Sequence, residues 1–292
     1  MKSLKLLFYI ALVATSCTSK HEKADAYGNF EATEIIVSSE VQGKLIDFNV
    51  DEGLELKAGD LVGHIDSLSL YYKKQQLVAQ VQAAEARIFQ ILDQVGVLEE
   101  QLDVLNTEKE RVEKLVETSS SPTKQLDDIN GQIRILKRQI KATQTQRKSV
   151  SAEMKSLLYQ VDQVQDQLEK SKIYNPIDGT VLEKYVETGE IILPTKPLYK
   201  IADLSTLRLR AYISEQQLTQ IKIGQNVKVY VDDKKNKLRS YKGKISWISS
   251  QAEFTPKTIQ TKEERVNLVY AIKIDVKNDG FLKIGMPAEV VF

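Results

Sequence analysis

Two short stretches of the chain alternate apolar and polar residues, which is typical of strands with one buried face. They occupy residues 41–66 and 173–203. The stretches share glycine and valine residues at equal offsets, namely Gly43, Val50 and Gly53 in the first and Gly179, Val186 and Gly189 in the second. Glycines at matching positions indicate matching turns. We therefore predict that the stretches are two halves of one small β unit, interrupted by the segment between them.

The intervening segment, residues 67–172, has a helical period. Its apolar residues recur alternately three and four positions apart, which is the pattern of a coiled-coil seam. The apolar seam positions are 77, 81, 84, 88, 91, 95, 98, 102, 105, 112 and 116 in the first arm, and 126, 129, 133, 136, 140, 150, 154, 157, 161, 164 and 168 in the second. Polar residues occupy the seam at Lys109 in the first arm and at Thr143 and Arg147 in the second. Each arm holds about 50 residues, so a hairpin of two antiparallel helices would project roughly 75 Å.

The two arms meet at residues 117–124, which read Glu-Thr-Ser-Ser-Ser-Pro-Thr-Lys. Hydroxyl side chains compete with the hydrogen bonds of a helical backbone, and Pro122 breaks a helix. A hydroxyl residue is also a candidate cap for the helix that follows. This stretch therefore predicts the tip of the hairpin.

The last third of the chain, residues 204–292, contains short strand-like runs with one short helix among them. The runs occupy residues 207–213, 224–231, 243–248, 266–276 and 287–292, and the helix occupies residues 214–221. Many short strands separated by turn residues favour a small barrel or sandwich. Residues 27–40 form a further strand region ahead of the first half of the β unit.

The N-terminus has the features of a bacterial lipoprotein signal. Lys2 and Lys5 precede an apolar run that is too short to span a bilayer, and the sequence Ala-Thr-Ser before Cys17 resembles a lipobox. We predict that residues 1–16 are removed, that Cys17 is acylated, and that residues 17–26 form a polar tether. The alternative is a chance cysteine within a discarded signal peptide. Cys17 is the only cysteine, so the chain forms no internal disulfide.

Composition and charge exclude several classes of function. The net charge is +1 with no long block of one sign, so nothing favours a nucleic-acid partner. His21 and His64 are the only histidines, which rules out a histidine-based metal cluster or catalytic triad. We identify no catalytic, cofactor-binding or metal-binding residue, and we predict that the protein is not an enzyme.

Three further motifs follow the two half-motifs in order: Ile201-Ala-Asp-Leu-Ser205, Ser214-Glu-Gln-Gln-Leu218 with Gly224-Gln225, and Ile284-Gly-Met-Pro-Ala288. Through these motifs residues 27–292 resemble the membrane fusion protein family, the HlyD-type periplasmic adaptors. The resemblance implies an elongated fold of mixed α and β class. Its parts would be a lipoyl-like β domain formed by residues 41–66 and 173–203, an antiparallel coiled-coil hairpin that splits it at residues 67–172, and a small β-barrel domain at residues 204–292.

One stretch of the predicted barrel resembles a particular subgroup of this family. Residues 252–261, followed by 268–270, resemble the small adaptors of ABC-type exporters. The resemblance implies a subunit of a tripartite efflux or secretion system, bridging an inner-membrane ABC-type permease and ATPase to a TolC-like outer-membrane channel. It also implies a homo-oligomer, a hexamer, in the periplasm with its lipid anchor in the inner membrane. An adaptor for a different pump class remains an alternative.

Family members that dock on TolC-like channels carry an arginine, then a leucine and then a serine at the hairpin tip. Arg111 and Leu115 match the first two positions. The third position is Pro122, with Ser121 before it and Thr123 after it. The resemblance therefore implies a channel-docking tip formed by Arg111, Leu115, Ser121 and Thr123.

Two other functions fit parts of the sequence. A lipoyl or biotin carrier shares the β unit, but the turn that would present the modified lysine, after Ile65 and Asp66, is replaced by the helical segment. A structural coiled-coil lipoprotein of the cell envelope shares the hairpin and the anchor. Both alternatives, like the adaptor, require no catalytic residue.

Overall fold

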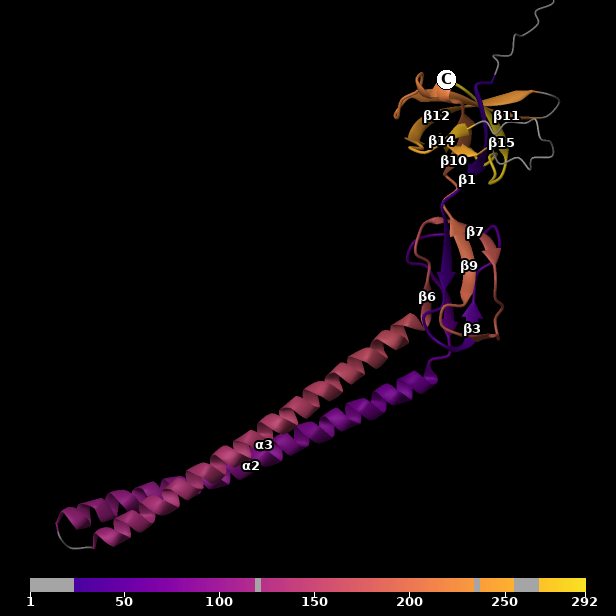
Figure 1. The fold of residues 1–292 in the computed structure, drawn as a ribbon. Coiled ribbons are helices and arrows are strands. Elements are labelled where there is room, and N and C mark those ends of the chain that lie inside the picture. Colours follow the sequence, from indigo (N-terminus) through magenta and orange to yellow (C-terminus); the bar gives the residue numbers. More distant parts are fainter. Residues whose placement is uncertain (1–23, 119–121, 234–236, 255–267) are drawn as a thin grey trace, which may run out of the picture.

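The computed structural model describes residues 24–118, 122–233, 237–254 and 268–292 (Figure 1). Cys17 and Ser121 lie outside the described residues. The chain forms a β-barrel at one end, a second β domain in the middle and a long helical hairpin at the other end (Figure 1). This arrangement confirms the predicted elongated fold of mixed α and β class, in which a hairpin splits a lipoyl-like domain and a small barrel follows.

The hairpin consists of α2 (Leu68–Glu117) and α3 (Thr123–Lys170). Pro122, and not a hydroxyl residue, occupies the position that caps the start of α3. The buried side chains of both helices all belong to the predicted seam, namely Leu77, Ala84, Ile91, Val95 and Val112 in α2, and Ile129, Ile133, Leu136, Ile140 and Val164 in α3. The heptad pattern therefore identified the interface between the helices correctly.

Polar contacts across the seam show that the two helices run antiparallel. Near the base, Nζ of Lys74 donates a hydrogen bond to Oε1 of Gln165 at 2.7 Å. Further along, Nη1 of Arg87 lies 3.8 Å from Oε1 of Glu153. From the first pair to the second, the residue number increases in α2 and decreases in α3, so the sequence numbers of facing residues add up to about 240.

The middle domain contains two four-stranded sheets, and each combines strands from both halves of the sequence repeat. One sheet has the order β2 (Glu34–Ser38), β9 (Pro197–Ala202), β7 (Gly179–Lys184) and β4 (Glu55–Leu56). The other has the order β6 (Lys172–Tyr174), β5 (Leu61–Ile65), β3 (Gly43–Phe48) and β8 (Ile191–Ile192). β3 pairs with β8, and β4 pairs with β7, so the two halves fold as one unit.

A strand pair of the middle domain holds the base of the hairpin. The chain leaves β5 to enter α2 and returns from α3 into β6, and these two strands are antiparallel neighbours. The backbone N–H of Ile65 donates to the carbonyl of Ser171 at 2.8 Å, and the N–H of Leu68 donates to Oδ1 of Asp66 at 3.0 Å. Both helices of the hairpin are therefore attached to the same pair of hydrogen-bonded strands.

A buried polar pair lies in the core of the middle domain. The Tyr199 hydroxyl donates to Oδ1 of Asn175 at 2.9 Å, and Nδ2 of Asn175 donates to the carbonyls of Lys57 and Ile177 at 2.9 and 2.6 Å. Burial raises the pKa of Tyr199 because the phenolate would lose its hydration. The pair thus links β9 to the loops on both sides of the hairpin insertion.

The barrel is a closed ring of six strands, completed by the pairing of β10 with β14. In order round the ring the strands are β10 (Thr206–Ile213), β1 (Ala26–Glu31), β15 (Pro287–Val291), β11 (Asn226–Asp232), β12 (Leu238–Ile248) and β14 (Leu268–Lys277). A short strand, β13 (Glu253–Phe254), pairs with β14, and a single helical turn, α4 (Glu215–Leu218), follows β10.

One barrel strand comes from outside residues 204–292. β1 lies between β10 and β15 and contributes the fully buried Phe30 to the core. Gly28 permits this close approach, because a Cβ atom at that position would collide with the backbone of Arg210. The predicted strand region at residues 27–40 is thus divided, with β1 in the barrel and β2 in the middle domain.

Candidate docking surfaces

The hairpin tip presents Arg111 and Leu115 on one face of α2. The two residues are four positions apart, so they lie on the same side of the helix. Nη1 of Arg111 pairs with Oε2 of Glu108 at 2.8 Å, and most of the Arg111 side chain stays exposed. The Leu115 side chain is 43% exposed. An arginine with several free donor directions beside an exposed leucine is suited to a small contact with another protein.

The seam under this face fixes the tip. Val112 packs with Ile129 and Ile133, and the half-buried Val116 and Leu126 extend the same cluster towards the turn. Leu115 is outside this cluster. Its side chain therefore adds to the outer face of α2 and not to the interface between the helices.

Thr123 lies on the other side of the turn. It is the first residue of α3 and is exposed. The structure thus brings three of the four predicted tip residues, Arg111, Leu115 and Thr123, to the end of the hairpin, whereas Ser121 lies outside the described residues.

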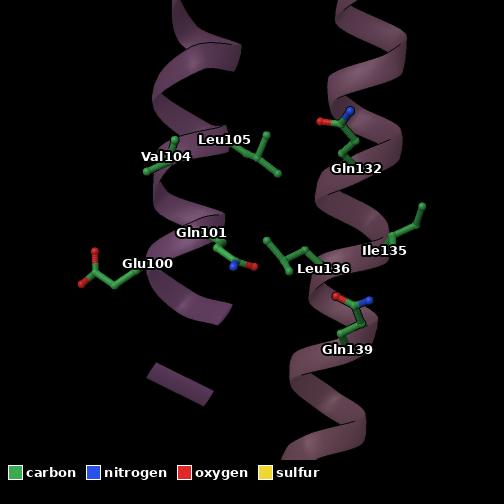
Figure 2. A pocket seen from close by; sticks show the side chains of 8 residues that line it. All are labelled: Glu100, Gln101, Val104, Leu105, Gln132, Ile135, Leu136 and Gln139. Atoms are coloured by element: carbon green, nitrogen blue, oxygen red, sulfur yellow. The ribbon is translucent and has the colours of Figure 1, made fainter. Parts of the chain in front are cut away.

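A groove runs along one side of the hairpin, about three to five turns from the tip (Figure 2). Leu105 and Leu136 point towards each other across the helix interface, and the neighbouring Val104 and Ile135 are exposed (Figure 2). The groove has a volume of about 540 Å³, and its remaining lining is Glu100, Gln101, Gln132 and Gln139. Exposed aliphatic side chains with amide groups around them resemble a helix-packing surface that lacks its partner.

A second apolar surface lies where the hairpin meets the middle domain. The exposed side chains of Leu68, Tyr72, Ile191 and Leu193 line a hollow of about 620 Å³. The sequence analysis did not identify this surface. The run at residues 191–193 is apolar throughout, and only pairing with β3 shows that Ile192 is buried while its two neighbours face outwards.

An ion cluster fixes the strands of the middle domain. Nζ of Lys200 on β9 lies 3.1 Å from Oε2 of Glu183 on β7 and 3.4 Å from Oε2 of Glu34 on β2. Hydrogen bonds to Glu183 and Tyr185 raise the pKa of Lys200. The hydrogen bond from Tyr185, followed by that from Lys200, lowers the pKa of Glu183. The cluster is therefore charged at neutral pH and ties three strands together.

Two further features, a metal site and a membrane-spanning helix, are absent from the described ranges. No group of three or more His, Cys, Asp or Glu residues there could hold a metal ion. The ring of His64, on β5, has Oγ of Ser67 as its hydrogen-bond neighbour at 3.3 Å. No helix among the described residues is long and apolar enough to span a bilayer. The surfaces that stand out among the described residues are the hairpin tip, the groove and the hollow at the base of the hairpin.

Comparisons with known proteins identify relatives that match nearly the whole chain. The UPF0194 membrane protein of Yersinia pseudotuberculosis serotype O:3 (strain YPIII) is 27% identical over 317 residues, covering 97% of this chain and 95% of that protein. The UPF0194 membrane protein YbhG of Salmonella gallinarum is 28% identical over 298 residues, covering 91% and 87%. The crystal structure of MacA from Actinobacillus actinomycetemcomitans matches with a TM-score of 0.52 and 26% identity, covering 91% of this chain and 76% of that chain.

Two protein-family models match successive parts of the chain. Residues 203–272 match the model described as LcnD-like, C-terminal domain. Residues 33–203, which are more than half of the chain and include the hairpin and the middle domain, match the model described as RND MFP, barrel-sandwich hybrid domain. The chain therefore belongs to the membrane fusion protein family, the periplasmic adaptors of efflux systems.

Proposed function

We propose that this protein is the adaptor subunit of a tripartite efflux or secretion system, in which it bridges an inner-membrane ABC-type exporter and a TolC-like outer-membrane channel. The observation that carries the proposal is the hairpin, whose helices of 50 and 48 residues end in an exposed tip. At 1.5 Å per residue the hairpin extends roughly 70 Å beyond the middle domain. The adaptor works by contact and not by catalysis.

The ABC class of the exporter is supported by the resemblance of residues 252–261 and 268–270 to small ABC-exporter adaptors. The described part of this stretch forms β13 and the start of β14. Self-association is supported by the exposed apolar surfaces on the hairpin and at its base, which copies of the same chain could cover. The proposed number of six subunits rests on the family resemblance.

The tip is the proposed site of channel contact. Replacing Arg111 with Asp should abolish co-purification with the channel protein and raise the sensitivity of cells to the exported compound, because an acidic group cannot donate to channel carbonyls. Leu115→Ser should weaken the same contact. The matched control is Arg138→Asp, which makes the same charge change at an exposed position of α3 away from the tip. Melting temperature and exporter binding should be unchanged in all three variants.

If Arg111→Asp and Leu115→Ser both retained the channel as the control does, the contact would have to lie elsewhere on the hairpin. The bridging role itself is tested by changing the length of the hairpin. Deleting residues 91–97 with 143–149 removes facing heptads, keeps the seam in register and shortens the hairpin by about 10 Å. Export should fail while exporter binding survives. Normal export by the shortened protein would refute the bridge and favour a structural envelope lipoprotein.

The proposed anchor is an acyl group on Cys17, which attaches the adaptor to the inner membrane. Cys17→Ala should leave a folded protein that no longer incorporates labelled palmitate and that a high-salt wash releases from membranes into the soluble periplasmic fraction. Persistent palmitate labelling of this variant would exclude Cys17 as the site of lipidation.

A further inference from the structure

Four neighbouring strands of the barrel begin or end at the same end of the domain, because each is antiparallel to the next. β1 begins there, β15 ends there, β11 begins there and β12 ends there, with Ala26 opposite Val290 and Asn226 opposite Lys244. This is the end farther from the hairpin, where the C-terminus lies (Figure 1). We call it the distal end of the barrel.

The chain preceding β1 is also attached at the distal end. The backbone N–H of Asp25 donates to the carbonyl of Val290 at 2.9 Å, and Oδ2 of Asp25 accepts a hydrogen bond from the N–H of Phe292 at 3.0 Å. Nε2 of Gln217, in α4, donates to the carbonyl of Asp25. The segment that leads back to Cys17 therefore departs from this end of the barrel.

A basic and aromatic surface lies at the same end, and we call it the Lys–Trp face. Trp247 near the end of β12 is 39% exposed, and Nζ of Lys273 lies 5.0 Å from the centre of its indole ring. Lys273 is opposite Trp247 in the neighbouring strand. An ammonium group at this distance is attracted to the indole ring, so the two side chains hold each other in place.

The turn before β11 completes the Lys–Trp face. The N–H of Gly224 donates to the carbonyl of Ile245 at 2.8 Å, which places the turn beside the end of β12. Ile223 in this turn is 65% exposed, and its neighbour Lys222 is exposed as well. A Cβ atom added at Gly224 would lie 3.9 Å from Cε of the exposed Lys244, so the lysine side chain runs beside this turn. The face is thus formed by Lys222, Ile223, Lys244, Trp247 and Lys273.

The charge of the face is positive. The face contains three lysines, one indole and one isoleucine, and Asp275, the acid opposite Lys244 on β14, pairs with Arg208 at 3.4 Å. Indole rings prefer the boundary between lipid headgroups and acyl chains, and lysines are attracted to anionic headgroups. An isoleucine at a turn can enter the same boundary without burying backbone groups. None of these residues lines one of the hollows described above, which suits a broad surface better than a small ligand.

We propose that the Lys–Trp face binds the surface of an anionic phospholipid bilayer, so that the barrel lies against the membrane with the hairpin pointing away from it. The proposal rests on the proposed function, in which an acyl group on Cys17 anchors the chain to the membrane. Seven residue steps from Cys17 to Ala24 span at most about 25 Å. β1 and β12 are separated by three strand spacings of about 4.8 Å each. The face is therefore within reach of the bilayer to which the tether leads.

Trp247 is the only tryptophan of the chain, so its fluorescence reports on this face alone. The full chain, isolated from membranes, is mixed with vesicles of phosphatidylcholine or of phosphatidylcholine with phosphatidylglycerol, each with brominated acyl chains. With phosphatidylglycerol the emission should shift to shorter wavelength and be quenched by bromine. Both effects should be lost in 1 M salt, where the screening length falls to about 3 Å.

The matched variants are Lys222→Glu with Lys244→Glu, and Lys277→Glu with Lys283→Glu. Both pairs make the same charge change, but Lys277 ends β14 opposite Thr206, at the barrel end nearer the middle domain. The first pair should lose the bromine quenching and the second should retain it. The proposal is overturned if quenching is equal in both lipid mixtures, if the two pairs behave alike, or if the emission shifts only when the exporter is added. Flotation with phosphatidylcholine vesicles reports on the lipid anchor separately, so loss of the anchor is distinguished from loss of the face.

Discussion

The barrel and the hairpin bury their apolar residues to different degrees. Among the described residues, the barrel has one core of 17 buried residues, contributed by six strands and the segments between them. The two helices of the hairpin contain 50 and 48 residues, yet each has only five buried residues. The barrel therefore completes its own core, whereas the hairpin buries one narrow seam and leaves the rest of its surface for other contacts.

The two helices of the hairpin also differ in how many large apolar side chains they leave exposed. α2 has eight exposed large apolar residues and α3 has three, and the eight on α2 are Leu68, Tyr71, Tyr72, Phe89, Leu92, Val97, Val104 and Leu115. A helix with apolar residues on more than one side is expected to pack against more than one neighbour. Since α3 covers only one side of α2, we expect a second neighbour for α2 in the assembled system.

The largest expected loss of stability comes from a substitution in the barrel core, and it tests the contrast between barrel and hairpin directly. Phe30→Ala should lower the free energy of unfolding by about 3–5 kcal/mol, because it leaves a cavity in the closed barrel. Phe30 is 0% exposed, whereas Phe89 on α2 is 59% exposed. Phe89→Ala is the matched control and should change stability by less than about 0.5 kcal/mol. Urea denaturation measures both, and similar losses would contradict the contrast between barrel and hairpin.

A smaller effect is expected inside the hairpin. Ile133 is buried in the cluster near the tip, and Ile135, two residues later, is exposed. Ile133→Ala should destabilise the hairpin by about 2 kcal/mol, the lower limit for a buried isoleucine, because the seam is only two helices wide. Ile135→Ala should be nearly neutral. Amide hydrogen exchange should show faster opening of the α2 and α3 tips in the first variant, with barrel protection unchanged. Faster exchange throughout the barrel would show that the two regions are coupled.

The sequence predicted the seam because helical periodicity is a local signal. The buried residues of both helices fell at the expected positions, and Leu115 correctly stood beside the seam and not in it. β1 was not assigned to the barrel, because its partners β10 and β15 are far away along the chain. An alternating pattern states that one face of a strand is buried, but it does not state against which sheet.

The docking surfaces were only partly predictable for a similar reason. Arg111 and Leu115 could be selected because their spacing matches a family pattern. The Lys–Trp face combines residues of a turn, β12 and β14, and no motif links them until the strands pair. The hollow at the base of the hairpin likewise joins α2 to β8, whose residues 191–192 lie far along the chain.

Breaking the buried pair of Tyr199 and Asn175 in the middle domain should lower the free energy of unfolding by an amount comparable to that of Ile133→Ala, or smaller. Asn175→Ala should cost about 1–3 kcal/mol, because it leaves the Tyr199 hydroxyl without an acceptor in the core. Tyr199→Phe removes the other half of the same hydrogen bond. In a double-mutant cycle the two changes together should cost less than the sum of the single changes. Additive losses would show that the hydrogen bond contributes little, and that the middle domain depends on apolar packing as the barrel does.

The smallest loss of stability is expected for a substitution at the groove on the hairpin, and the same substitution should strongly impair assembly. Val104 is exposed at the groove on the hairpin and contributes little to the buried seam (Figure 2). Val104→Glu should therefore leave the melting temperature nearly unchanged, but it should reduce the mass of the assembly in analytical ultracentrifugation, because a buried unpaired carboxylate is costly at a contact between subunits. Asn106→Glu introduces the same charge on the opposite side of α2, where the side chain is also exposed, and serves as the control. If neither variant, nor Ile135→Glu across the groove, altered the mass, the hairpin would stand apart from its neighbours and its exposed apolar side chains would need another partner.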